Sequence, residues 1–273
     1  MDWTDRHCRF FHRQLTKSAL LYTEMVVADA LIHGDVPRHL AFNDCEHPLA
    51  LQLGGSDPEK LARAARTGAD WGYDEINLNV GCPSDRVQSG TFGACLMREP
   101  ERVADCVKAI KDSVSIPVTV KCRIGVDDQD TQIALDNMYE KTHEAGCNAH
   151  WVHARKAWLQ GLSPKENRDI PPLDYGRVFE LKNAHPDAFI GINGGITALD
   201  TTTEMLNQMN GVMIGRAAYQ NPQILSRVDE LVYGADPCEL NFGSLAQTMM
   251  HYARKHLQAG GRVHHVTRHM IGL

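Results

Sequence analysis

Long apolar runs are absent from this sequence of 273 residues, and so are several common spacings of cysteine and glycine. No uncharged stretch reaches the roughly 18 apolar residues that a membrane helix needs, so we expect no membrane contact. The first residues resemble neither a signal peptide nor a transit peptide. The eight cysteines form no Cys-x-x-Cys pair, which argues against a zinc site or a disulfide framework. We therefore expect no metal, reduced thiols and a cytoplasmic location.

Acidic residues are missing from one part of the chain, residues 240–273. All 34 Asp and Glu residues lie before this segment, which carries four basic side chains and five histidines, while the whole chain has a net charge of −6. An acidic catalytic body with a tail that binds a polyanion would show this asymmetry. A short, solvated basic segment would show it as well, so charge alone leaves both interpretations open.

Short apolar runs rich in β-branched residues alternate with helical patterns along the chain. We expect strands near 20–24, 48–53, 75–80, 116–122, 149–153, 188–192 and 211–215. We expect helices near 57–71, 100–113, 130–145, 174–184, 198–208 and 217–232. Strands separated by helices indicate a parallel sheet covered by helices. The chain has seven of these strands, and a closed barrel has eight. The predicted fold is therefore an α/β protein of the (β/α)8 TIM-barrel class.

The two ends of the chain do not match a complete barrel. Residues 3–14 have a helical pattern with no strand before it, which predicts that the first strand of the barrel is missing from this chain. Apolar residues at helical spacing predict a helix over 243–258, and a further apolar stretch follows at 270–273. We therefore expect a barrel domain over 1–235 and, over 240–273, the start of a basic helical domain that is truncated.

Polar residues stand at the ends of almost all the predicted strands, where barrels of this class carry their functional groups. They are Glu24, Gln52, Asn77, Asn79, Cys82, Lys121, Arg123, His153, Arg155, Asn193 and Arg216. A single polar residue at a strand end is commonly a capping group. Polar residues at the ends of so many strands predict a functional site.

Two glycine-containing turns predict that this site binds a phosphate. Asn193-Gly194-Gly195 and Gly215-Arg216 follow the last two strands, where barrels often hold phosphate with loop amides. Glycine permits close approach of the backbone, and arginine offers a fork of donors. No Gly-x-Gly-x-x-Gly follows a strand, so a Rossmann-type dinucleotide site is not supported.

Two further strand-end residues have chemistry that the motifs leave open. Cys82 lies between Gly81 and Pro83 at the start of a long loop, and no histidine base is near it in sequence, which favours a thiol that donates a proton over a nucleophile. Lys121 could form a Schiff base, neutralise a phosphate or stabilise negative charge on a flavin. An aldolase-like or decarboxylase-like barrel acting on a phosphorylated small molecule is the alternative.

With these residues in view, the sequence resembles the tRNA-dihydrouridine synthases, in particular their bacterial 20/20a branch, over essentially its whole length. The blocks that carry the resemblance are DWTDRHCRFF (2–11), YTEMV (22–26), LQLGGSDP (51–58), YDEINLNVGCPSDRVQSGTFGACLM (73–97), VTVKCRIGVDD (118–128), HARKAWLQGLSPKENRDIPPLDY (153–175), INGGI (192–196), GVMIGRAAYQNP (211–222) and TRHMIGL (267–273). The blocks at 73–97 and 153–175 are the most specific.

The resemblance implies a reaction and a set of roles. Uridine at positions 20 and 20a of the tRNA D-loop would be reduced to 5,6-dihydrouridine, with hydride from reduced FMN, a proton from Cys82, and NADPH as the source of reduced flavin. Residues matching flavin-binding positions are Met1, Gln52, Lys121, His153, Asn193, Gly194, Gly195, Gly215 and Arg216. Residues matching positions that face the base or contact tRNA are Asn79, Lys156, Lys165, Arg168 and Arg268.

Two other functions compete with this one. A small-molecule flavin oxidoreductase of the dihydroorotate or dihydropyrimidine type would share the flavin site, but it has no need of a basic tail free of acids. A tRNA-binding protein without catalysis would follow if the missing strand prevented flavin binding. We expect a monomer whose macromolecular partner is tRNA.

Overall fold

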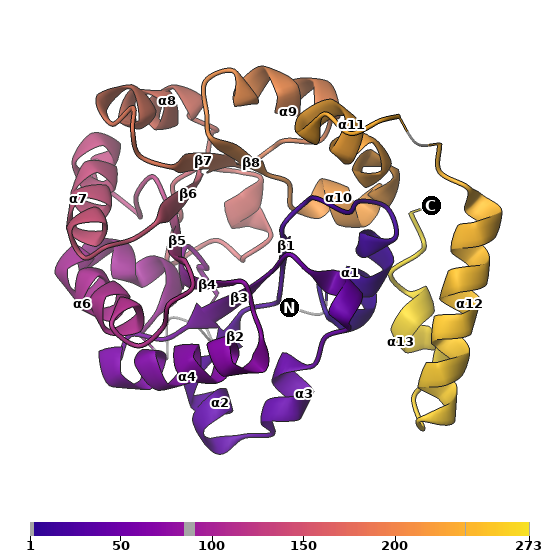
Figure 1. Cartoon of the computed structure of the whole chain (residues 1–273). Helices are drawn as coiled ribbons and strands as arrows, with labels where there is room; N and C mark the ends of the chain where they lie inside the picture. Colours follow the sequence, from indigo (N-terminus) through magenta and orange to yellow (C-terminus); the bar gives the residue numbers. More distant parts are fainter. Residues whose placement is uncertain (1–2, 85–90, 238, 273) are drawn as a thin grey trace.

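The computed structural model describes residues 3–84, 91–237 and 239–272, and it shows parallel strands curled into a barrel (Figure 1). The strands are β1 (Leu21–Tyr22), β2 (Val26–Val27), β3 (Leu49–Gly54), β4 (Glu75–Val80), β5 (Val118–Arg123), β6 (Ala149–His153), β7 (Ile190–Asn193) and β8 (Gly211–Met213). Their order is β1-β3-β4-β5-β6-β7-β8, with β2 also paired to β3. The predicted TIM-barrel class is confirmed.

Helices surround this sheet on its outer face (Figure 1). They are α1 (Arg6–Arg13), α2 (Ala28–His33), α3 (Val36–Leu40), α4 (Pro58–Trp71), α6 (Pro100–Lys111), α7 (Thr131–Glu144), α8 (Tyr175–Ala184), α9 (Leu199–Leu206), α10 (Arg216–Gln220), α11 (Val228–Tyr233), α12 (Phe242–Gln258) and α13 (Val263–Thr267). Aspartates 57, 130 and 174 cap α4, α7 and α8 by accepting hydrogen bonds from the first-turn amides. These caps explain why the helices begin where the sequence predicts. No helix of the described residues is both long enough and apolar enough to cross a membrane.

The strand expected at 20–24 is observed as the short β1, and a second short strand, β2, follows outside that range. Leu21 pairs with Leu49 and Val26 pairs with Leu53, so β1 and β2 follow one another along the same edge of β3. In the described part of the chain, β8 pairs with β7 and has no pairing with β1 or β2, so the barrel is open between β8 and β1.

Alternation along the strands separates an apolar outer layer from a polar interior. Leu49, Leu51 and Leu53 of β3 are fully buried in the main core, which lies between the sheet and the helices. The intervening residue Gln52 faces the other way, and its amide reaches Asn77 of the next strand at 2.9 Å. The inside of the barrel is therefore lined by groups that hydrogen-bond to one another.

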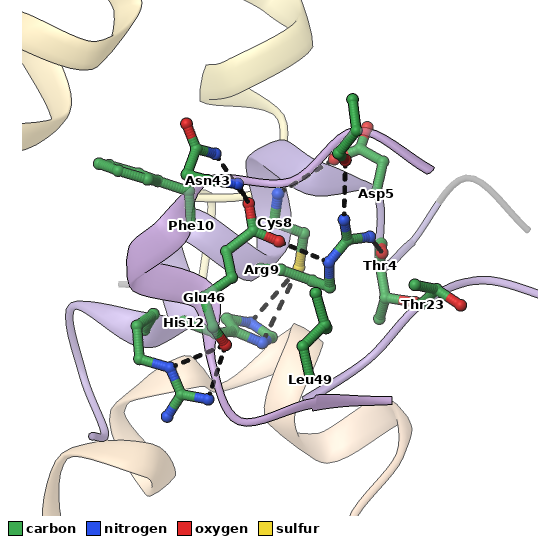
Figure 2. Close-up of polar contacts among 12 residues, drawn as sticks. Thr4, Asp5, Cys8, Arg9, Phe10, His12, Thr23, Asn43, Glu46 and Leu49 are labelled. Atoms are coloured by element: carbon green, nitrogen blue, oxygen red, sulfur yellow. Dashed lines mark hydrogen bonds and ion pairs between the residues drawn. The ribbon is translucent and has the colours of Figure 1, made fainter. Parts of the chain in front are cut away.

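Helix α1 is fixed to the barrel by a buried ion pair (Figure 2). Arg9 Nε donates to Glu46 Oε2 at 2.7 Å, and the Glu46 side chain is fully buried. The other carboxylate oxygen of Glu46 accepts hydrogen bonds from the backbone and side-chain amides of Asn43. Arg13, one turn further along α1, donates to the Glu46 carbonyl. The loop before β3 and the first helix are thus held as one unit.

The C-terminal helices share a second core with the barrel, and Figure 1 shows α12 and α13 beside α1. This core consists of Phe11, Leu15, Ala218, Ile224, Leu225, Val228, Leu245, Met249 and Val266. The single helix expected over 217–232 is wrong: α10 ends before Asn221-Pro222, a 3-10 segment follows over Pro222–Arg227, and α11 comes next. Proline disfavours the helical conformation in the residue before it and lacks an amide donor, which accounts for the break.

Candidate functional site

The strand register brings the predicted strand-end residues side by side. Asn79 pairs with Lys121 across β4 and β5, Arg123 pairs with His153 across β5 and β6, and His153 pairs with Asn193 across β6 and β7. Alternating residues point to the same side of a strand. Lys121 and Arg123 therefore share the barrel interior with His153 and Asn193, at the carboxyl ends of their strands.

A series of hydrogen-bonded side chains connects the three neighbouring strands β3, β4 and β5 inside the barrel. Asn79 Nδ2 donates to Gln52 Oε1 at 2.8 Å, and Gln52 Nε2 donates to Asn77 Oδ1 at 2.9 Å. Asn77 Nδ2 then donates to the hydroxyl of Thr119 at 2.8 Å. Because each amide both donates and accepts, the series fixes which way the amide of Gln52 points. The Gln52 and Asn79 side chains are thereby held in one orientation.

Cys82 is held by the same network through its backbone. Its N–H donates to Asn79 Oδ1 at 2.9 Å, and the Gly81 carbonyl accepts from Arg123 Nε at 3.1 Å. The sulfur lies 3.6 Å from the hydroxyl of Ser84 and close enough to influence the pKa values of three cations, those of Lys121, Arg123 and Arg168. Gly90 and the rest of the following loop over 85–90 lie outside the described residues. The thiol therefore lies near the group of strand-end cations.

Lys121 is a half-buried cation that is joined to an amide across the barrel. Its Nζ donates to Asn193 Oδ1 at 3.1 Å, and Asn193 in turn donates to the carbonyl of Met213 at 2.7 Å. Burial, and then the neighbouring Arg123 guanidinium, lower the pKa of Lys121 to about 8. A lysine with this pKa is still mostly protonated at neutral pH, but it gives up its proton more readily than a surface lysine.

His153 stands among cations and is therefore neutral. Burial lowers its pKa well below the ordinary value, and the charges of Arg123, Lys121, Arg155 and Arg216 lower it further. Its ring lies against Gly194, where an added Cβ would come within 2.7 Å of the His153 ring. A neutral imidazole can donate from one ring nitrogen and accept at the other.

The two glycine turns lie where the phosphate site was expected. Gly194 and Gly195 have positive φ angles of 119° and 67°, which residues with a side chain rarely adopt. Gly215 precedes α10, and a Cβ added there would meet nothing within 4 Å, so open space lies beside this backbone. Arg216, the next residue, donates to Asp169 Oδ1 at 2.8 Å. A backbone next to open space with a guanidinium beside it suits an anion.

Arginine 168 adds a further cation whose hydrogen bonding is incomplete. Its Nε is buried and has no hydrogen-bond partner, and its pKa is lowered by burial and then by the charge of Arg216. The Nε of Arg155 is buried without a partner as well. Buried donors without partners are costly, so they point to an acceptor supplied by a ligand.

Three predicted residues have other surroundings. The ammonium of Lys156 donates to the Gln129 carbonyl at 2.6 Å, and Lys165 is exposed at the start of the 3-10 turn Glu166–Arg168. The guanidinium of Arg268 forms an ion pair with Asp5, the cap of α1, at 2.6 Å. Met1 lies outside the described residues.

Sequence reasoning missed the residue that shapes the loop after β6. Asn167 is fully buried, and its side chain accepts from the Trp158 amide and donates to the Trp158 and Leu162 carbonyls. Its own carbonyl accepts from Arg123 at 3.0 Å. An asparagine in a polar loop gives no pattern that would mark it. The polar interior layer of Tyr22, Glu75 and Thr119 was missed too, because the predicted strands near 20–24, 75–80 and 116–122 do not end at these residues.

The fold and the site together define a parallel (β/α) barrel that carries a thiol and a group of cationic side chains at the carboxyl ends of its strands. The sequence model of the family described as Dihydrouridine synthase (Dus) matches residues 1–273. The chain is 56% identical over 273 residues to the tRNA-dihydrouridine(20/20a) synthase of Shewanella oneidensis, covering 100% of this chain and 81% of that protein. It is 54% identical over 274 residues to the protein of that name from Escherichia coli K12, covering 100% of this chain and 79% of that protein.

The chain belongs to the dihydrouridine synthase family. Enzymes of this family are flavin-dependent oxidoreductases that reduce uridine to dihydrouridine in tRNA.

Proposed function

We propose that this chain reduces uridine to 5,6-dihydrouridine in the D-loop of tRNA, at positions 20 and 20a. The observation that carries the proposal is the position of Cys82, whose backbone N–H donates to Asn79 and whose preceding residue, Gly81, accepts from Arg123 through its carbonyl. A proton donor beside an anion-binding barrel end is what reduction of a carbon–carbon double bond requires. The same activity is named for relatives that are 54% to 56% identical.

The residues present fit FMN as the flavin. Open space beside Gly215 and the guanidinium of the next residue, Arg216, suit a phosphate. Gln52, Lys121 and His153 would hold the ring system, and Asn193, Gly194, Gly195, Gly215 and Arg216 would hold the phosphate. Bound FMN would supply hydride to carbon 6 of the uracil, and NADPH would reduce the flavin again.

The protein's own residues would complete the reaction. The thiol of Cys82 donates its proton to carbon 5 of the uracil, opposite to the hydride. The side chain of Asn79, oriented by Gln52, faces the base and fixes its orientation. The charge of Lys121 would stabilise negative charge on the flavin ring. The neutral His153 would donate a hydrogen bond to the flavin without adding a further charge.

A uracil must leave its stack to reach the end of a barrel, so the tRNA needs to be held elsewhere. We propose that the helical region over 240–273 provides this grip. Arg254, Lys255 and Arg262 are exposed there, and no acidic residue lies in the segment. Lys156, Lys165, Arg168 and Arg268 are proposed as additional tRNA contacts. Binding should then weaken with salt, because phosphate contacts release counterions. We further propose that the enzyme acts as a monomer in the cytoplasm.

Mass analysis of tRNA fragments tests the function directly. Unmodified tRNA is incubated with the chain, FMN and NADPH, and the D-loop fragment should gain two hydrogen atoms for each reduced uridine. Free uracil and orotate serve as the comparison substrates. Turnover of these small molecules with an unchanged D-loop would assign the chain to the small-molecule flavin oxidoreductases instead. A chain that binds tRNA but neither binds nor uses flavin would be a binding protein without catalysis.

A further inference from the structure

Three histidines from distant parts of the sequence meet where the C-terminal helices contact α1. His7 belongs to α1, His256 to α12 and His265 to α13, the three neighbouring helices in Figure 1. One ring nitrogen from each can be chosen so that all three lie within 4.8 Å of one another. In the part of the chain that the structure describes, they are the one group of three His, Cys, Asp or Glu side chains with this spacing.

The rings of this histidine cluster are held in place by their surroundings. Nδ1 of His7 lies 2.8 Å from the hydroxyl of Tyr252, which leaves Nε2 of His7 to face the other rings. Tyr252 is itself stacked on Phe10 at a centroid distance of 3.9 Å. A partner on the second ring nitrogen is the usual arrangement for a histidine that binds a metal, since it fixes the tautomer.

His256 fits closely over the turn that follows α12. A Cβ added at Gly261 would lie 2.1 Å from His256 Nε2, so the imidazole occupies space that any other residue at Gly261 would fill. His256 Nε2 lies 3.0 Å from His265 Nδ1. Tetrahedral zinc with bonds of about 2.0–2.1 Å separates its nitrogen ligands by roughly 3.4 Å. The pair needs to open by a few tenths of an ångström, and His7 needs to approach by at most about 1.5 Å.

The charges around the cluster are compatible with metal binding. Zinc binds imidazole in its neutral form, so the charges around the three rings matter. Arg6 on α1 adds a positive charge that opposes a cation, and Asp5 adds a negative charge that favours one. Asp5 is already paired with Arg268 and His269, so it is not available as a ligand.

We propose that His7, His256 and His265 bind one divalent transition metal, Zn2+ by preference, with water as the fourth ligand. Imidazole nitrogens suit zinc, and three protein ligands leave one position of a tetrahedral site to solvent. The metal would join α1 of the barrel to both C-terminal helices. This function is separate from uridine reduction, because none of the three histidines belongs to the strand-end site.

Zinc titration of the full chain tests the site. The chain is stripped with a chelator, and Zn2+ is titrated against a chromophoric competitor at neutral pH. Replacing any one of the three, as in His7→Gln, His256→Gln or His265→Gln, should weaken zinc binding at least tenfold. His251→Gln and His264→Gln change exposed histidines on the same two C-terminal helices and should alter the affinity less than twofold. Cluster variants that bind zinc as tightly as these controls would overturn the proposal.

Two measurements guard against variants that lose their fold. Zinc should raise the melting temperature of the original chain and of both control variants, but not that of the cluster variants, because only a folded site binds the metal. X-ray absorption at the zinc edge of the unaltered chain should show nitrogen and oxygen neighbours only. Sulfur neighbours would place the metal on cysteines and refute the histidine site without any substitution. Tyr252→Phe, which removes the partner of His7, should weaken binding by about 10- to 100-fold.

Discussion

Lys121 and Asn193 lie on strands separated by β6, and their side chains meet at a distance of 3.1 Å between Nζ and Oδ1. This bond crosses the barrel interior and fixes a half-buried ammonium at the end that carries Cys82. Asn193 is fixed in turn, because its amide donates to the Met213 carbonyl. The position of the charge is thus set by three strands and does not depend on a surface loop.

Lys121→Met should lower the flavin content of the purified chain at least tenfold. The substitution keeps most of the side-chain volume and removes the charge that we assign to the flavin ring. Lys156→Met is the matched control, since the ammonium of Lys156 contacts the Gln129 carbonyl, away from the paired strand ends. Flavin absorbance per chain is the measurement. Equal flavin content in both variants would show that Lys121 does not bind the cofactor.

Cys82→Ala should keep its flavin and its reduction by NADPH, but it should reduce uridine at least about 100-fold more slowly. The reason is that the thiol supplies the proton. Alanine keeps the contact that positions this residue, because Asn79 accepts a hydrogen bond from the backbone amide of Cys82 and not from its sulfur. Single-turnover mass analysis of tRNA measures the loss. Cys95→Ala, at a half-buried cysteine, is the control. Normal turnover by Cys82→Ala would remove the thiol from the mechanism.

Replacing Lys165 and Arg168 together by alanine should weaken tRNA binding severalfold with little change in flavin content. Each lost phosphate contact should also reduce the slope of log affinity against log salt by about 1. The single variants separate two roles, because Lys165 is exposed while Arg168 has a buried Nε beside Arg216. Filter binding at several salt concentrations gives the slopes. If Arg168→Ala loses flavin while Lys165→Ala does not, Arg168 belongs to the phosphate site.

Glu46→Gln should lower the free energy of unfolding by about 3–5 kcal/mol, since it leaves the guanidinium of Arg9 buried without its counter-charge. Arg9→Met should be similarly harmful. The double variant should be less destabilised than the sum of the two, because no buried charge remains unpaired. Urea unfolding of all four proteins gives the coupling energy. Additive losses would mean that the 2.7 Å pair contributes little.

Lower pH should destabilise the fold, because some buried histidines are neutral in the folded chain and become protonated when it unfolds. Burial lowers the pKa of His150 to about 3, and Thr142 bonds its ring at 2.8 Å. The unfolded chain takes up this proton near pH 6.5 and the folded chain does not, so stability falls as the pH drops from about 6.5 towards 3. Between pH 7 and pH 5.5 the loss from His150 is about 1 kcal/mol.

The pH dependence can be assigned by comparing two variants. His150→Gln should make the unfolding free energy less sensitive to pH between 7 and 5.5, while keeping a polar group near Thr142. His251→Gln, at an exposed histidine on α12, should leave the sensitivity unchanged. A parallel pH response in all three proteins would assign the effect to other buried histidines such as His12, whose pKa is lowered to about 4.

Much of the fold follows from the sequence because local signals agree with it. The predicted helix over 57–71 is observed as Pro58–Trp71, with aspartate before it and Gly72 in the left-handed conformation after it. The interruption at Asn221-Pro222 could have been predicted from the proline. The two short helices α2 and α3 carry no strong periodic pattern, so only the packed structure reveals them.

The strand-end site was predictable because parallel strands place their carboxyl ends together. Asn79, Lys121, His153 and Asn193 were found in this way, and the register brings them to neighbouring positions. Contacts between distant segments could not be predicted. His7 and His256 are separated by more than two hundred residues, and no spacing rule relates them.

The shared core of Phe11, Ile224, Leu245 and Val266 has a consequence for cleavage of the chain. A protease cut between α11 and α12 would sever the backbone but leave the apolar contacts of both sides in place. We expect the two fragments to stay associated during gel filtration and to melt in one cooperative transition. The charge composition changes at residue 240, but we expect the barrel and the C-terminal helices to unfold together.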